Sequence, residues 1–143
     1  MKEYIRVCSV DEEGRYGGPQ QRTIEIAKGI IKYGIKTTVI FPKLDSIEFE
    51  DRLIKAKIDY HPFNLTRLSL EPKVFIKYIF TFLIETFQLF LYFKNKKYDI
   101  IQINGTPQYK GAIAGKLAGI KVVWIFEDTK MPKVIKLLPL LTL

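Results

Sequence analysis

Two adjacent glycines and an arginine stand at the start of a predicted helix. The stretch RYGGPQQR places Gly17 and Gly18 after an apolar segment and an acidic cluster, and Arg22 follows one turn into the helix. The first turn of a helix has backbone N–H groups without partners, and the helix dipole favours negative charge there. Glycine lets a phosphate approach without a Cβ in the way, and Arg22 could add a charged hydrogen bond. The pattern predicts a phosphate-binding loop, although a plain strand-to-helix turn explains it as well.

Two more polar segments follow predicted strands. The first is EDT, which comprises Glu127, Asp128 and Thr129. An acid pair there could orient a hydroxyl group or act as a base; alternatively, Asp128 or Thr129 caps the next helix. The second segment is NGT, which comprises Asn104, Gly105 and Thr106. Asn-Gly is a turn signal first, but we expect its side-chain amide to face the same cleft as the acid pair.

The rest of the sequence predicts an alternation of strands and helices. Apolar runs rich in β-branched residues favour strands at residues 4–10, 36–41, 58–63, 98–103 and 120–126. Apolar residues at helical spacing favour helices at residues 20–33, 48–57, 71–93 and 107–117. Such an alternation implies a parallel sheet with helices on both faces. We therefore expect a single α/β domain with a doubly wound sheet of about five strands in the order 3-2-1-4-5.

This fold would bring the three polar segments together. In a doubly wound sheet, ligands bind outside the carboxyl ends of the strands. Segments 11–18, 104–106 and 127–132 follow the carboxyl ends of the first, fourth and fifth predicted strands. The sequence thus predicts a cleft at one edge of the sheet.

Several kinds of site are excluded by the residues present. The sequence has one histidine, His61, and one cysteine, Cys8, which are too few for a zinc cluster. A catalytic Ser-His-Asp or Cys-His group, the P-loop pattern and the G-x-G-x-x-G fingerprint are also missing. We expect no metal and no bound cofactor. Cys8 is predicted to be a small core residue in a protein from a reducing compartment.

The segment 74–93 is long and apolar enough to cross a membrane. It nevertheless carries one narrow polar stripe, made of Lys77, Thr81, Glu85 and Gln88. The charges of Lys77 and Glu85 would be costly inside the bilayer core. We therefore expect that this helix does not span a membrane.

The apolar arc of the same helix is wider than one sheet face requires. Lysines follow it, and an aromatic face next to lysines fits shallow docking on anionic lipid. The residues that we expect to face lipid are Val74, Phe82, Phe90, Lys94, Lys96 and Lys97. An ordinary core helix with a solvated lysine turn, or cover by a second domain or a partner, remain alternatives.

The positive charge of the chain is uneven. Of the net charge of +8, residues 1–93 contribute +2 and residues 94–143 contribute +6. A basic half can bind nucleic acid, anionic lipid or a phosphorylated ligand, and it can also be a solvated helix surface. The aromatic residues cluster on one helix and do not interleave with the basic residues, so we expect no nucleic-acid binding.

Two long stretches resemble a known family. GGPQQRTIEIAKGIIKYGIKTTVIFP resembles the opening of the N-terminal domain of glycosyltransferase family 4, with its Gly-Gly loop, its helix and a glycine before the next strand. YDIIQINGTPQYKGAIAGKLAGIKVVWIFEDTKMP resembles the fourth strand, helix, fifth strand and following loop of the same domain. The resemblance covers nearly the whole chain and is weakest from residue 46 to residue 98.

The resemblance implies the acceptor-side, Rossmann-like half of a GT-B enzyme that transfers a sugar from a nucleotide-sugar donor with retention. It implies that Gly17 and Gly18 approach the donor diphosphate, and that the acceptor is a lipid-linked molecule or a polysaccharide. Asp128 lies in the loop where many members place a catalytic histidine or aspartate. This sequence has Glu127 and Asp128 there but no histidine, which leaves the role of Asp128 open.

In the family, a linker and a donor domain continue beyond the position where this sequence ends. We therefore expect a truncated enzyme or one half of a split enzyme, which needs a separate donor-domain chain and is inactive alone. The resemblance implies a cytoplasmic protein, with peripheral binding to the inner face of the plasma membrane as an option. The alternative is a non-enzymatic module that binds a membrane surface or a partner.

Overall fold

The protein forms a five-stranded parallel sheet with helices on both faces. The computed structural model describes residues 4–105 and 107–126. The strands pair in the order β3-β2-β1-β4-β5, which confirms the predicted doubly wound topology. Their bounds are β1 Ile5–Val10, β2 Ile35–Pro42, β3 Asp59–Phe63, β4 Ile100–Asn104 and β5 Lys121–Ile125.

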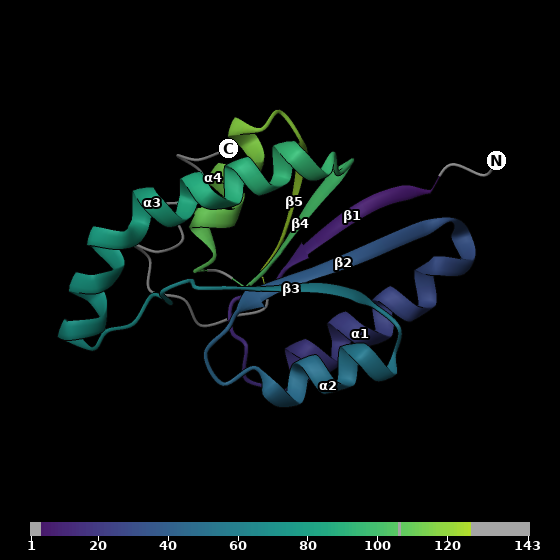
Figure 1. Cartoon of the computed structure of the whole chain (residues 1–143), viewed down its shortest axis with the longest axis horizontal. Helices are drawn as coiled ribbons and strands as arrows, with labels where there is room; N and C mark the ends of the chain where they lie inside the picture. Colours follow the sequence, from purple (N-terminus) through teal and green to yellow (C-terminus); the bar gives the residue numbers. More distant parts are fainter. Residues whose placement is uncertain (1–3, 106, 127–143) are drawn as a thin grey trace.

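The helices form two layers (Figure 1), with α1 and α2 on one side of the sheet and α3 and α4 on the other. Their bounds are α1 Gly18–Ile30, α2 Ile47–Lys55, α3 Pro72–Lys96 and α4 Tyr109–Leu117. Each layer has its own apolar core because successive strand residues point to opposite faces. In β2, Val39 and Phe41 pack with α1 and α2, whereas Ile40 between them packs against the side of α3 and α4.

The ends of the helices follow from local chemistry. Pro72 opens α3 at its first turn, where the missing N–H costs nothing. Gly34 has a φ of 78°, and its N–H donates to the carbonyl oxygen of Ile31, which closes the first helical segment.

Some predicted bounds of helices and strands were wrong. The first helix begins earlier and ends in a 3-10 turn at Ile31–Tyr33, Pro42 belongs to β2, and α3 continues to Lys96.

The middle of the polar stripe of α3 faces the protein, whereas Lys77 and Gln88 of the same stripe are exposed. Glu85 is buried and Thr81 is half-buried, while most large apolar side chains of the helix point to solvent. The helix runs antiparallel to the strands, and its first turns project past their carboxyl ends (Figure 1). The choice of lipid-facing residues stays a prediction. Val74, Phe82 and Phe90 are only half-exposed, whereas Lys94, Lys96 and Lys97 are exposed.

Candidate functional site

A buried polar cluster closes the carboxyl ends of β1 and β4. The Nδ2 atom of Asn104 donates to Asp11 Oδ1 at 2.5 Å and to Ser9 Oγ at 2.8 Å. Its Oδ1 atom accepts from Gln102 Nε2 at 3.0 Å, and Thr23 Oγ1 donates to Asp11 Oδ1 at 3.1 Å. The cluster fixes the start of α1 against β1 and β4.

The NGT segment therefore has a structural role at its first two residues. The predicted cleft amide of Asn104 is buried, and the cluster uses it to hold the loops together. Gly105 has a φ of 87°, which favours glycine. Its carbonyl oxygen accepts from Trp124 Nε1 at 2.9 Å. The structure thus supports the interpretation of Asn104 and Gly105 as a turn. Gly105 also lines a cavity.

Gly14, Gly17 and Gly18, between β1 and the start of α1, differ in whether packing requires a glycine. A Cβ on Gly14 would lie 2.1 Å from the carbonyl oxygen of Pro42, so this position requires glycine for packing. Gly17 has an extended backbone with a φ of −166°, and a Cβ there would meet the Gln20 side chain at an ordinary 3.5 Å. A Cβ on Gly18 would have nothing within 4 Å. Neither predicted phosphate-loop glycine is needed for the turn, and both leave space open at the start of α1.

A small cavity of about 210 Å³ lies against this open backbone. Gly17, Pro19 and Gln20 line one side, and Asn104 and Gly105 line the other. The structure thus places Gly17 and the Asn104–Gly105 turn around one cavity at the predicted edge of the sheet. Arg22 is exposed on α1 and does not line this cavity.

A larger cavity of about 540 Å³ adjoins the small one, and the two share Glu12, Glu13 and Arg15. Its walls come from the loops after β1, β2 and β3 and from α3. Pro42, Leu44, Phe63, Leu65 and Val74 give the cavity an apolar part. Its basic residues are Arg15, Lys43, Arg67 and Lys77, and its acidic residues are Glu12, Glu13, Asp45 and Glu85.

Glu13 ties two walls of the larger cavity together. Its Oε1 atom accepts from Arg15 Nη2 at 2.7 Å and from Arg67 Nη1 at 3.2 Å. Arg15 lies in the same loop as Glu13 and Arg67 lies in the loop after β3, so the pair with Arg67 connects the loops after β1 and β3. The sequence reading missed Glu13, Arg15, Lys43, Arg67 and Lys77 as site residues. The signal for the first four was their position just after the carboxyl ends of the first three strands.

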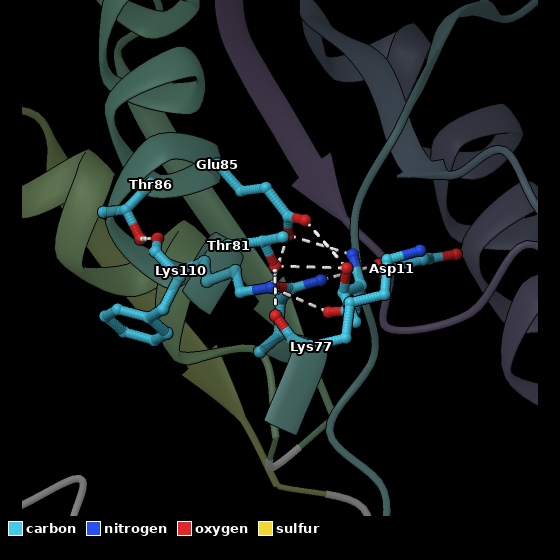
Figure 2. A network of polar contacts seen from close by, with 9 residues as sticks. Asp11, Lys77, Thr81, Glu85, Thr86 and Lys110 are labelled. Carbon is cyan, nitrogen blue, oxygen red and sulfur yellow. Dashed lines mark hydrogen bonds and ion pairs between the residues drawn. The ribbon is translucent and has the colours of Figure 1, made fainter. Parts of the chain in front are cut away.

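Behind the larger cavity, a buried ion pair joins α3 to α4 (Figure 2). Lys110 Nζ pairs with Glu85 Oε2 and donates to the carbonyl oxygen of Thr66 at 2.8 Å. Thr66 in turn donates its N–H to Glu85 Oε2 at 2.9 Å and its hydroxyl to Oε1 at 2.8 Å. Thr66 also lines the cavity, so the ion pair positions one cavity wall.

The pair is ionised in the fold. Burial by itself would raise the pKa of Glu85, but hydrogen bonds from Lys110 and Thr66 outweigh burial and hold the pKa below its ordinary value. Burial lowers the pKa of Lys110, and the carboxylate of Glu85 opposes this effect. The ammonium of Lys110 also lies 4.0 Å from the centroid of the Tyr78 ring, which favours the charged form.

Other predicted site features stand as follows. Thr106, Glu127, Asp128 and Thr129 lie outside the described residues. Within residues 4–105 and 107–126, no group of three or more His, Cys, Asp or Glu side chains could hold a metal ion. Cys8 is fully buried, and burial raises the pKa of its thiol, so it is a core residue as predicted and no nucleophile.

Solved structures share this fold. MurG from Acinetobacter baumannii superposes with a TM-score of 0.70 at 17% identity, over 94% of this chain and 38% of MurG. A glycosyltransferase from Rickettsia africae superposes with a TM-score of 0.69 at 20% identity, over 96% of this chain and 34% of that enzyme. The C-terminal domain of a Pyrococcus furiosus hydrogenase gives 0.58 at 14% identity, over 87% of this chain and 92% of that domain.

The fold therefore matches a Rossmann-like half of GT-B glycosyltransferases. The chain spans less than two-fifths of the length of the first two proteins. A scan against protein-family models and a search of curated proteins gave no match. Identities this low show the fold alone, and the hydrogenase domain shows that proteins of other function share it.

Proposed function

We propose that this chain is the acceptor-side domain of a GT-B glycosyltransferase, which transfers a sugar from a nucleotide-sugar donor to a lipid-linked or polysaccharide acceptor. One observation carries the proposal. Two adjoining cavities lie at the carboxyl edge of the sheet, and the smaller one faces a Gly-Gly backbone that neither the turn nor the packing requires. Both glycosyltransferases named above share the fold.

The donor diphosphate approaches the start of α1 in this proposal. Gly17 lines the small cavity, and Gly18 begins the helix, whose first N–H groups and dipole favour an anion. Arg15 lines both cavities and is better placed for a charged contact than Arg22, which the sequence favoured. The acidic pair Glu12 and Glu13 on the same wall keeps the affinity for a free diphosphate low.

The acceptor occupies the larger cavity. Its apolar wall and its four basic and four acidic side chains suit a molecule that has both an apolar and a polar part. Val74 and Lys77 bring the start of α3 into this wall. A lipid-linked acceptor fits this combination better than a neutral polysaccharide does.

The reaction itself needs parts beyond the described residues. Asp128, with Glu127 beside it, is the proposed catalytic acid pair, Thr129 and Thr106 are proposed cleft residues, and transfer proceeds with retention. The donor nucleotide is a substrate and not a resident cofactor. We propose that a donor domain completes the enzyme, that the acceptor-side domain alone is inactive, and that the protein works in the cytoplasm.

The test is a titration of the isotope-labelled chain with millimolar uridine or guanosine diphosphate, followed by amide NMR. We expect the amide signals of Gly17, Gly18 and Gln20 to shift. Gly18→Val should abolish these shifts, because its side chain would fill space that is open in the fold. Gly29→Val is the matched control, since Gly29 lies in the same helix and also has open space around it. Equal shifts in both variants, or no shifts in the parent, would contradict the diphosphate role.

The exposed apolar face of α3 favours a second candidate function. The chain would then be a non-enzymatic module that binds a membrane surface or a partner protein. This candidate predicts that neither nucleotide affects the amides at the start of α1, so the same titration separates the two functions.

A further inference from the structure

Helix α3 places Glu85 and Thr81, the middle of its polar stripe, towards the protein. Glu85 on the inner side pairs with Lys110 of α4, and Leu89 and Phe93 enter the core. Figure 2 shows Glu85 and Thr81 of α3 pointing towards Lys110. The buried ion pair fixes which side of the helix faces the sheet, so it also fixes which side faces outwards.

The outward side forms a continuous apolar surface, which we name the α3 face. Ten residues between positions 74 and 93 are exposed, and eight of these are large and apolar. The α3 face consists of Phe75, Ile76, Ile79, Phe80, Leu83, Ile84, Phe87 and Leu91. At 100° per residue these eight side chains fall within one half of the helix circumference. A monomeric soluble protein rarely exposes an apolar patch of this kind without a partner for it.

This helix is long and apolar enough to span a membrane, but its packing rules that out for this fold. A spanning helix would be surrounded by lipid, whereas α3 packs along α4 and supplies Leu89 and Phe93 to the core. Only one side of it is available to lipid. That geometry is the one adopted by a helix that lies in the plane of the interface.

Lysines stand at both ends of the α3 face. Lys73 and Lys77 lie at its start, Lys94, Lys96 and Lys97 follow its end, and all five are exposed. The two groups are about 30 Å apart along the helix axis. The only acidic residue within α3 is Glu85, which is buried in the ion pair. Lys94 Nζ lies 5.5 Å from the centroid of the Phe90 ring, so its stem follows the apolar surface while its charge stays at the rim.

We propose that the α3 face docks flat on the surface of an anionic lipid bilayer, with its apolar side chains among the acyl chains and its lysines at the level of the lipid phosphates. A second copy of the chain would bring lysines against lysines in either orientation of the two helices, because both ends are basic. The anionic bilayer matches both features of the face. The proposal goes beyond sugar transfer and does not depend on it.

The experiment measures sedimentation of the protein with vesicles of phosphatidylcholine, with and without phosphatidylglycerol. We expect binding to the anionic vesicles at low salt, weaker binding to neutral ones, and loss of binding as salt rises. The double variant Phe80→Gln/Leu83→Gln should bind at least about tenfold more weakly. Both side chains are 77% exposed, so the fold should not change, and circular dichroism checks this. The control is Ile47→Gln/Ile54→Gln, which removes exposed apolar residues from α2 on the opposite side of the sheet.

A lysine pair tests the charged part of the proposal. Lys94→Gln/Lys96→Gln should weaken binding to anionic vesicles by about fivefold per lysine and leave neutral vesicles unaffected. Lys32→Gln/Lys121→Gln is the charge-matched control away from α3. Absence of vesicle binding at low salt, or equal binding by the α3 and control variants, would overturn the proposal. So would a dimer in analytical ultracentrifugation that the Phe80/Leu83 variant dissociates while the parent protein binds no vesicles.

Discussion

Replacing Lys110 by methionine tests the buried ion pair that joins α3 to α4. Lys110 is 1% exposed, the lowest value for any charged residue within the described part of the chain. Methionine fills much of the volume of the lysine stem but removes the ammonium. The change leaves the carboxylate of Glu85 buried without its cation, although it still accepts from the N–H and the hydroxyl of Thr66.

The expected cost follows from the contacts that are lost. Removing one partner of a buried ion pair costs about 3–5 kcal/mol, because an uncompensated charge stays inside the protein. The remaining donors of Thr66 at 2.8 and 2.9 Å keep the value near about 3 kcal/mol. For a chain of this length the same change lowers the melting temperature by about 10 °C.

Urea unfolding followed by circular dichroism measures the effect. Lys55→Met is the matched control, because Lys55 pairs with Asp51 at 2.5 Å on an exposed surface and should lose less than about 1 kcal/mol. The double variant Glu85→Gln/Lys110→Met removes both charges and leaves an amide that can accept from Thr66. Its loss should be smaller than the sum of the two single losses by at least about 1 kcal/mol.

Two results would refute this reasoning. If Lys110→Met unfolds at the same urea concentration as Lys55→Met, the pair does not hold α3 against α4. If the double variant loses the full sum of the single changes, Glu85 and Lys110 do not interact, and the orientation of α3 must have another cause.

Two further predictions concern pH and glycine packing. Since the pKa of Glu85 is lowered in the fold, its contribution to stability is present above the ordinary pKa of 4.5 and is lost as the pH falls through the lower pKa of the folded state. The difference in free energy of unfolding between the parent and Glu85→Gln should therefore be largest near neutral pH and shrink in acid, and a pH-independent difference would contradict this. Gly14→Ala should destabilise the protein by about 1–3 kcal/mol, because its Cβ would collide with the Pro42 carbonyl oxygen. Gly18→Ala, with open space at its Cβ, should be neutral or slightly stabilising in urea unfolding, and equal losses at the two glycines would show that the loop packs differently.

Much of the fold could be predicted from local patterns. The period of apolar residues separates strands from helices, and right-handed crossovers leave few topologies, so the order of the five strands follows. Gly34 and Pro72 lie at helix ends, where local chemistry favours them because capping depends on the neighbouring backbone alone. The Gly-Gly loop and the NGT turn were placed at one edge because parallel strands end on the same side.

The walls of the larger cavity could not be predicted in the same way. The ion pair of Glu13 with Arg67 joins two loops, and its distance depends on how the loops cross the sheet edge. The role of Asn104 could not be predicted either, because it also depends on a contact between distant segments. Whether its amide faces a ligand or a buried carboxylate depends on Asp11, which lies 93 positions away in the sequence.

The sequence by itself predicted a helix at residues 71–93 with one polar stripe and a wide apolar arc. It could not determine which side faces the protein, because both sides can be buried against some surface. The tertiary structure decided this through Lys110, whose buried ammonium requires a carboxylate partner. Glu85 supplies that partner, and so Glu85 and Thr81 of the stripe lie inside while the α3 face lies outside. A contact between residues 25 positions apart thus creates the surface that we propose binds lipid.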